Sequence, residues 1–232
     1  MPVTVRELVR TQVDFLLFKP VRIRPGQNFW QWFAFVFAIT WAVGVGRYWD
    51  HPSARDWQYF GMGSVGYILI LSALIYVVVW PLRPKHWEYQ GVLIFVGLTS
   101  LPAGLYAIPV EKIVDLETAQ RINAWFLGIV ALWRVALCVR YLLTYAKLHW
   151  FLTITTVVLL LSGIVFTLAM LNLEHVVFDL MAGIRPEDAT PNDIAYLIVF
   201  GLAFFSLYAF PVALMVYLVA IVLRLKTRHA ET

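Results

Sequence analysis

The stretch Ala124-Trp-Phe-Leu-Gly-Ile-Val-Ala-Leu-Trp-Arg-Val-Ala-Leu-Cys-Val139 is apolar apart from one charged residue, Arg134. A run of this kind predicts a membrane-spanning helix, with the arginine near its middle. A cation at that depth costs about 2.5–3.5 kcal/mol on insertion scales, so it usually faces a protein partner or a wet cavity. We therefore expect Arg134 either to bond structurally to backbone carbonyls or hydroxyls, or to act as counter-ion for an anionic substrate or lipid headgroup.

The composition of the whole chain agrees with this interpretation. Of the 232 residues, 61% are hydrophobic and 14% are charged, whereas a soluble domain has about 25% charged residues. The single cysteine, Cys138, excludes an intrachain disulfide and a cysteine-built metal site. All histidines fall outside the apolar runs, so a pair of haem ligands within the membrane is not expected. No cofactor is predicted, bound lipid or pigment apart, and nucleic acid is not expected as a partner because aromatic residues do not alternate with base-binding charges.

Apolar runs of bilayer-spanning length recur along the chain. They cover residues 29–46, 60–81, 92–110, 122–146, 150–173 and 194–223. Pro102 and Gly104 interrupt the third run. The sequence therefore predicts an all-α integral membrane protein, a polytopic bundle of about six transmembrane helices in residues 28–224. An N-terminal amphipathic interfacial helix and a basic linker are expected in residues 1–27, and a cytoplasmic tail in residues 225–232.

The distribution of positive charge predicts the orientation. Twelve of the 18 basic residues lie in the N-terminal segment, in the second and fourth loops and in the tail. They are Arg6, Arg10, Lys19, Arg22, Arg24, Arg83, Lys85, Arg140, Lys147, Arg224, Lys226 and Arg228. We expect both termini to be cytoplasmic, in a bacterial inner membrane, with an acidic surface on the opposite side.

Residues 4–18 read as an amphipathic helix. Thr4-Val-Arg-Glu7 fits a capping box, in which the threonine and glutamate side chains satisfy free backbone amides. The apolar face expected from the helical period consists of Val5, Leu8, Val9, Val13 and Leu16. Basic residues that would meet anionic lipid at the cytoplasmic face are Arg6, Arg10, Arg22 and Arg24. The alternative is a helix packed on the cytoplasmic ends of the bundle.

Two loop clusters carry polar side chains that could do chemistry. Glu174 and His175 precede Asp179, which lies one helical turn after the histidine; this predicts half of a metal or proton-transfer site, or a structural network. Arg47 and Trp49 follow the first apolar run, and we interpret them as an interface anchor rather than as ligands.

A short motif recurs between the third and sixth runs. Leu105-Tyr-Ala-Ile-Pro-Val110 resembles Leu207-Tyr-Ala-Phe-Pro-Val212, which is either a chance match or the trace of a three-plus-three inverted repeat. In a true repeat, Pro109 and Pro211 would break corresponding helices and bring the open third span near Arg134. Residues expected to bind substrate or lipid are accordingly Arg134, Pro102, Pro109 and Tyr106.

Three functions follow from these features. The first is a structural or accessory subunit of a larger membrane assembly, formed with other membrane subunits or as a homo-oligomer and without enzymatic chemistry of its own. The second is a small transporter or channel built as an inverted repeat, with Arg134 near the substrate path. The third is a membrane enzyme that uses Glu174, His175 and Asp179 on the side opposite the cytoplasm.

Overall fold

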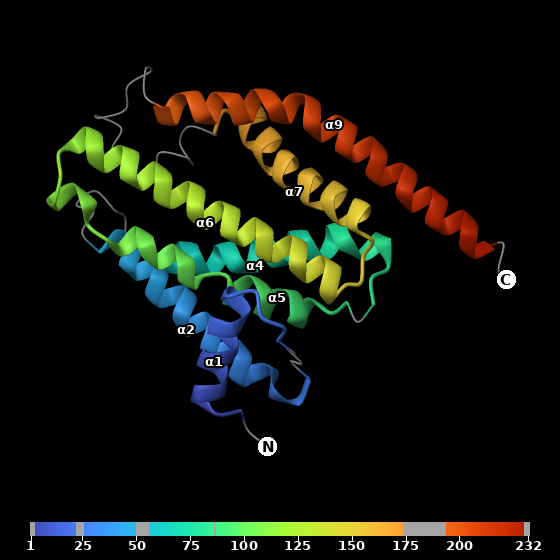
Figure 1. The fold of residues 1–232 in the computed structure, drawn as a ribbon, viewed down its shortest axis with the longest axis horizontal. Helices are drawn as coiled ribbons and strands as arrows, with labels where there is room; N and C mark the ends of the chain where they lie inside the picture. The colour runs from blue at the N-terminus through green and yellow to red at the C-terminus, as the bar shows by residue number, and fades with distance from the viewer. Residues whose placement is uncertain (1–2, 22–25, 50–55, 86, 174–193, 230–232) are drawn as a thin grey trace. The chain divides into compact units, whose positions relative to one another are not determined.

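The computed structural model describes residues 3–21, 26–49, 56–85, 87–173 and 194–229, and all regular secondary structure in them is helical (Figure 1). Six helical segments are long and apolar enough to cross a membrane. They are Phe29–Tyr48, Met62–Leu82, Tyr89–Ala107, Arg121–Thr144, Trp150–Met170 and Ile198–Arg224. The helical class and the six candidate spans predicted from the sequence are confirmed.

The chain folds into two compact units. Unit 1 consists of Met1–Val77, His86–Pro109 and Leu132–Leu137; unit 2 consists of Val78–Lys85, Val110–Ala131 and Cys138–Thr232. Unit 1 thus holds most of the first three candidate spans, and unit 2 holds most of the last three.

Unit 1 is built mainly from α1, α2, α4 and α5, with short helical turns between them. Its elements are α1 (Val5–Leu16), η1 (Gly26–Asn28), α2 (Phe29–Tyr48), α3 (Asp56–Tyr59), α4 (Met62–Val79, of which residues 62–77 belong here), α5 (Tyr89–Leu98) and η3 (Leu101–Ala107). The tightest packing lies between α2 and α5. A Cβ atom on Gly97 would stand only 2.6 Å from Cβ of Val36, which is fully buried. Only glycine allows the two helices to approach this closely.

The third candidate span is broken, as Pro102 and Gly104 predict. Its α-helical part, α5, ends at Leu98, and Thr99 is its C-cap. Pro102 has no N–H to donate, and in a continued α-helix its ring would collide with the carbonyl four residues earlier, which is that of Leu98. The chain therefore continues as the tighter 3-10 helix η3, with Pro102 in its first turn.

Helix α1 has the predicted capping box, and part of its predicted apolar face is buried in the protein. Thr4 Oγ1 accepts the backbone N–H of Glu7, and the Glu7 carboxylate accepts that of Thr4. The buried residues are Leu8, Gln12, Phe15 and Leu16, whereas the predicted Val5, Val9 and Val13 are exposed. The sequence interpretation left out the polar Gln12, whose amide pairs with a carbonyl of α5 and so turns this side of the helix toward the protein.

Unit 2 is dominated by the pair α7 and α9. Its elements are η2 (Trp80–Leu82), η4 (Val110–Lys112), α6 (Leu116–Thr144, of which residues 132–137 belong to unit 1), α7 (Trp150–Met170) and α9 (Ile194–His229). Helices α7 and α9 lie side by side (Figure 1). The rings of Phe166 and Phe210 stack at 4.9 Å between centroids, and Gly163 leaves room for the second ring.

Helix α6 begins with a side-chain cap. Asp115 accepts the backbone N–H of Thr118 at 3.0 Å. This hydrogen bond stabilises the charged carboxylate and holds the pKa of Asp115 below its ordinary value.

Helix α9 continues through Pro211, so the helix break that a true inverted repeat would place there is not present. Residues on both sides of it pack inward: the Phe210 ring lies on α7, and Ala213 and Tyr217 are buried. This packing offsets the one hydrogen bond that the proline cannot make. The backbones of the two matching motifs therefore differ, because Leu105 to Ala107 are 3-10 helix whereas the second copy is α-helical.

The loops predicted to share one side of the membrane meet at one end of unit 2. The Lys85 backbone N–H donates to the Ala146 carbonyl at 3.2 Å, which joins the second loop to the fourth. Arg224, near the end of α9, donates to the Leu82 carbonyl, which joins the tail to the second loop. The contacts agree with the predicted grouping of these loops; their cytoplasmic side stays a prediction.

Gly97→Ala is expected to destabilise the protein by about 1–3 kcal/mol, the usual cost of overpacking a core. The matched control is Gly66→Ala in α4, where a Cβ atom meets nothing within 4 Å and alanine favours a helix by roughly 0.5–1 kcal/mol. Thermal unfolding in detergent measures both variants. Equal midpoints would contradict the close contact between α2 and α5.

Candidate functional site

The break of the third candidate span is where polar groups of unit 1 gather. The last carbonyls of any helix lack partners within that helix, and an unpaired carbonyl in hydrocarbon costs several kcal/mol. Side chains from other helices supply the missing donors. Gln12 Nε2 donates to the Leu98 carbonyl at 3.3 Å, and Arg134 Nε donates to the Thr99 carbonyl at 2.9 Å.

A hydroxyl pair completes this network. Thr40 Oγ1 on α2 donates to Ser100 Oγ at 2.8 Å, and both side chains are buried. Three consecutive residues at the break are therefore bonded to three different helices: Leu98 to α1, Thr99 to α6 and Ser100 to α2. The break acts as the polar junction of unit 1.

Arg134 is half-buried and uses only part of its hydrogen-bonding capacity. Its guanidinium carbon lies 5.7 Å from the centre of the Tyr67 ring, within cation–π range. Within the described ranges, its Nη atoms have no hydrogen-bond acceptor and no carboxylate pairs with it. The bond to Thr99 matches the structural interpretation of this arginine, while the Nη donors stay available to an anion.

A second arginine, Arg47, lies near Tyr106 in the broken third span. The Arg47 guanidinium stands 5.2 Å from the centre of the Tyr106 ring, and Tyr106 interacts electrostatically with both Arg47 and Arg134. Trp49 Nε1 donates to the Ala107 carbonyl at 3.0 Å, at the end of η3. Arg47 and Trp49, predicted as an interface anchor, thus contact the broken third span. Guanidinium and phenol donors together suit a phosphate or a carboxylate.

Of the two predicted prolines, only Pro102 lies next to this junction. Pro102 is buried in the first turn of η3, and Pro109 follows that helix. Sequence reasoning missed Gln12, Thr40 and Tyr67. Only Gln12 had a usable signal, because it stands four residues from both Leu8 and Leu16, within an otherwise apolar helix face.

The C-terminal end of α1 is also held at this junction. Trp133 Nε1 donates to the Leu16 carbonyl at 3.0 Å, and the rings of Phe15 and Phe95 meet edge to face at 5.9 Å. Trp133 directly precedes Arg134 in α6, and it donates to a carbonyl at the C-terminal end of α1 as Arg134 donates to one at the end of α5.

The remaining predicted site residues lie elsewhere. Arg6 and Arg10 are exposed on α1, and Arg10 lies 3.8 Å from Asp14. The predicted residues Glu174, His175, Asp179, Arg22 and Arg24 lie outside the described residues. Among the residues that the structure does describe, no group of three His, Cys, Asp or Glu side chains could hold a metal ion.

No protein-family model, curated protein or solved structure matches this chain. Its function has to be argued from its own surfaces and contacts.

Gln12→Leu is expected to lower stability by about 1–3 kcal/mol, although leucine is more apolar and of similar size. The reason is that the buried Leu98 carbonyl loses its donor. Val9→Leu, on the exposed side of the same helix, is the control and should change stability by less than about 0.5 kcal/mol. If the thermal midpoint of Gln12→Leu in detergent equals that of Val9→Leu, the break does not need this pairing.

Proposed function

We propose that this chain is an integral membrane protein and a structural or accessory subunit of a larger membrane assembly, without enzymatic chemistry of its own. The proposed location is a bacterial inner membrane, with both termini cytoplasmic. One observation carries the proposal: an exposed row of aromatic side chains along α9.

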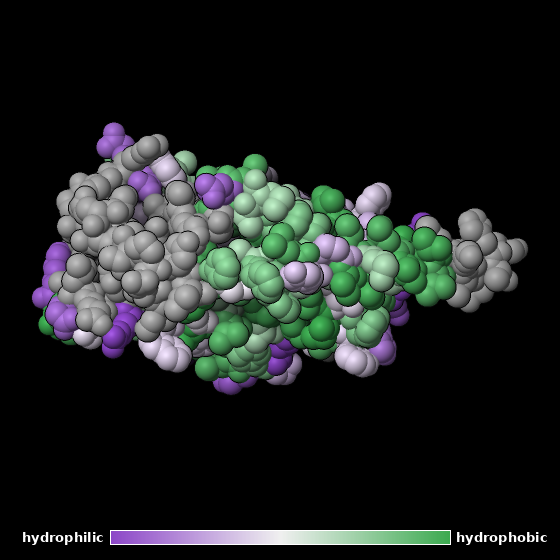
Figure 2. Space-filling view, turned by 90° about the horizontal axis from the view of Figure 1, so that it is seen from above, coloured by the Kyte–Doolittle hydropathy of each residue, from purple (hydrophilic) through white to green (hydrophobic). Residues whose placement is uncertain are grey.

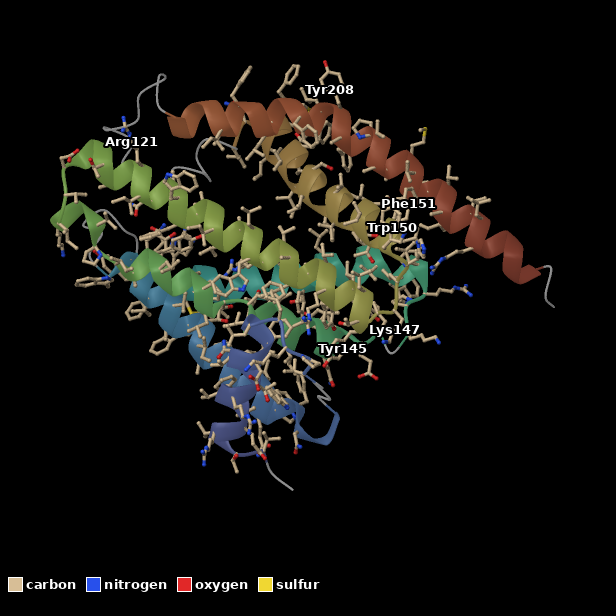
Figure 3. The ribbon with its side chains drawn as sticks, in the orientation of Figure 1. Arg121, Tyr145, Lys147, Trp150, Phe151 and Tyr208 are labelled. Atoms are coloured by element: carbon tan, nitrogen blue, oxygen red, sulfur yellow. The ribbon has the colours of Figure 1, made fainter. Side chains whose placement is uncertain are left out.

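The row consists of Phe200, Phe204 and Tyr208, spaced one helical turn apart. These side chains are 58%, 54% and 64% exposed, and successive ring centres lie 6.5 Å and 5.3 Å apart. Tyr208 points away from α7 (Figure 3). Figure 2, seen from the side on which α9 lies in Figure 1, shows a mainly apolar surface along this helix. Aromatic rings contribute large contact areas to lateral helix packing.

The hydroxyl of Tyr208 favours a protein partner over lipid chains alone. Tyr208 lies near the middle of the candidate span Ile198–Arg224, where lipid offers no hydrogen-bond acceptor. A buried tyrosine hydroxyl normally has a partner. A second membrane helix, from another subunit or another copy of this chain, supplies both an acceptor and a packing surface.

The turn between α6 and α7 supports an additional contact with anionic lipid headgroups. Lys147 is exposed there, and Trp150 and Phe151 at the start of α7 are also exposed (Figure 3). Indole rings beside a cation are typical of the boundary between headgroups and acyl chains.

A small transporter or channel is the second candidate, and the observation that favours it is that the Nη atoms of Arg134 have no hydrogen-bond acceptor among the described residues. The inverted repeat adds little support, because Pro211 leaves α9 unbroken whereas the third candidate span is interrupted. No contact in the described residues favours the enzyme hypothesis.

The double variant Phe204→Ala/Tyr208→Ala should release the protein from its native complex, because two of the three aromatic side chains of the row that contacts the partner are removed. The mass of the complex extracted in native lipid nanodiscs measures this. The control is Trp125→Ala, which removes an equally exposed aromatic side chain of α6 outside the row. A monomeric wild-type protein, or a complex that survives the double variant, would argue against the subunit function.

The second candidate predicts that Arg134→Leu abolishes anion flux while Arg134→Lys keeps part of it, because lysine retains the charge. Phosphate and chloride efflux from proteoliposomes measures this. Wild-type flux in Arg134→Leu, or no wild-type flux above that of empty vesicles, would remove the transporter hypothesis.

A further inference from the structure

The hydrogen bonds of α1 show which positions along the candidate spans of unit 1 lie beside each of its ends. At the N-terminal end, the Val3 backbone N–H donates to Gln31 Oε1 at 2.9 Å. Gln31 is the third residue of the candidate span Phe29–Tyr48. Helix α1 therefore starts level with one end of that span.

The C-terminal end lies level with the middle of two other spans. Gln12 is bonded to Leu98, which is near the centre of Tyr89–Ala107. Leu16 is bonded to Trp133, which is near the centre of Arg121–Thr144. A helix that lay flat at the headgroups could not reach both partners.

The length of α1 fits half of a bilayer. Twelve residues at about 1.5 Å per residue give a helix of about 18 Å, and half of a hydrocarbon core of about 30 Å is about 15 Å. Residues 17–28 connect α1 to α2, and twelve residues at about 3.3 Å each are long enough to return across that distance.

A row of apolar side chains runs along the outward face of α1, beside the exposed Arg6 and Arg10. Val5, Val9, Val13 and Leu17 are spaced one turn apart and are 71%, 47%, 44% and 56% exposed. We define these four residues as the outer row. At the depth given by Gln12 and Leu16, the surroundings of such a row are acyl chains rather than headgroups.

The charges of α1 are arranged in a way that lowers their cost at this depth. Arg10 and Lys19 both approach the Asp14 carboxylate, at 3.8 Å and 3.0 Å. Arg6 and Glu7 lie in the first turn, next to the headgroups. Side chains of a helix lean toward its N-terminus, so the long arginine side chains can extend toward the membrane surface.

We propose that α1 is a re-entrant helix that enters the bilayer from the cytoplasmic side, ends near mid-depth and presents its outer row to lipid acyl chains. This proposal rests on the proposed membrane insertion of the spans. It gives α1 a different partner from the anionic headgroups expected for a helix lying at the interface.

Spin labels on single cysteines measure the depth. In a Cys138→Ala background, a label replaces Val5, Val9, Val13 or Leu17, and the protein is reconstituted in phosphatidylcholine and phosphatidylglycerol vesicles. Collision with oxygen, compared with a water-soluble nickel chelate, reports the depth of each label. The depth should rise steadily from position 5 to position 17, toward the total of about 18 Å that the helix length allows. Ile70, exposed in the middle of the candidate span Met62–Leu82, serves as the deep reference, and the exposed Ile113 serves as the aqueous reference.

Two results would overturn the re-entrant helix. The first is that all four labels lie at the same shallow depth, and the second is that the nickel chelate reaches all four. In both cases a deep label at position 70 would show that the spans are still inserted. Nickel access at position 70 as well would show that the spans are not inserted. The proposed membrane function would then fail, and the re-entrant helix with it.

Discussion

The packing of unit 1 depends on pairing the backbone carbonyls that open where the third candidate span breaks. Pro102 ends α5 at Leu98, and the freed carbonyls of Leu98 and Thr99 each need a donor because both residues are buried. Gln12 and Arg134 supply those donors from α1 and α6. Thr40 adds a hydroxyl pair from α2. One interruption in one helix therefore determines where three other helices must place a polar side chain.

Arg134 shows how an expensive charge can be retained in an apolar segment. The insertion cost of about 2.5–3.5 kcal/mol is comparable with the cost of about 1–3 kcal/mol for leaving a buried carbonyl unpaired. The hydrogen bond to Thr99 and the ring of Tyr67 together offset much of the cost of the charge. The same hydrogen bond removes the cost of an unpaired Thr99 carbonyl. The remaining guanidinium donors, which have no acceptor among the described residues, are the basis of the second proposed function.

The two units use their apolar surfaces differently. In unit 2, α9 packs on α7 through Phe210 and keeps the row of Phe200, Phe204 and Tyr208 exposed. In unit 1, α1 packs its polar Gln12 inward and leaves a row of aliphatic side chains outside. The tyrosine hydroxyl within the first row supports the proposed protein partner, and the aliphatic second row supports the proposed contact with lipid. The surfaces, rather than a titratable cluster, carry the functional argument.

The sequence alone determined the features that depend on local chemistry. The length and hydropathy of the apolar runs predicted six spans, Thr4 and Glu7 predicted the cap of α1, and Pro102 predicted the break. Only the tertiary structure decided which groups pair and which faces are buried. Gln12 and Leu98 are 86 residues apart. The helical periodicity around Gln12 gives no information about a hydrogen-bond acceptor so far away in the chain. For the same reason the sequence left open the effect of Pro211, through which α9 continues. Its effect depends on the packing of α9 against α7, whereas Pro102 follows an α5 whose end is stabilised by donors from other helices.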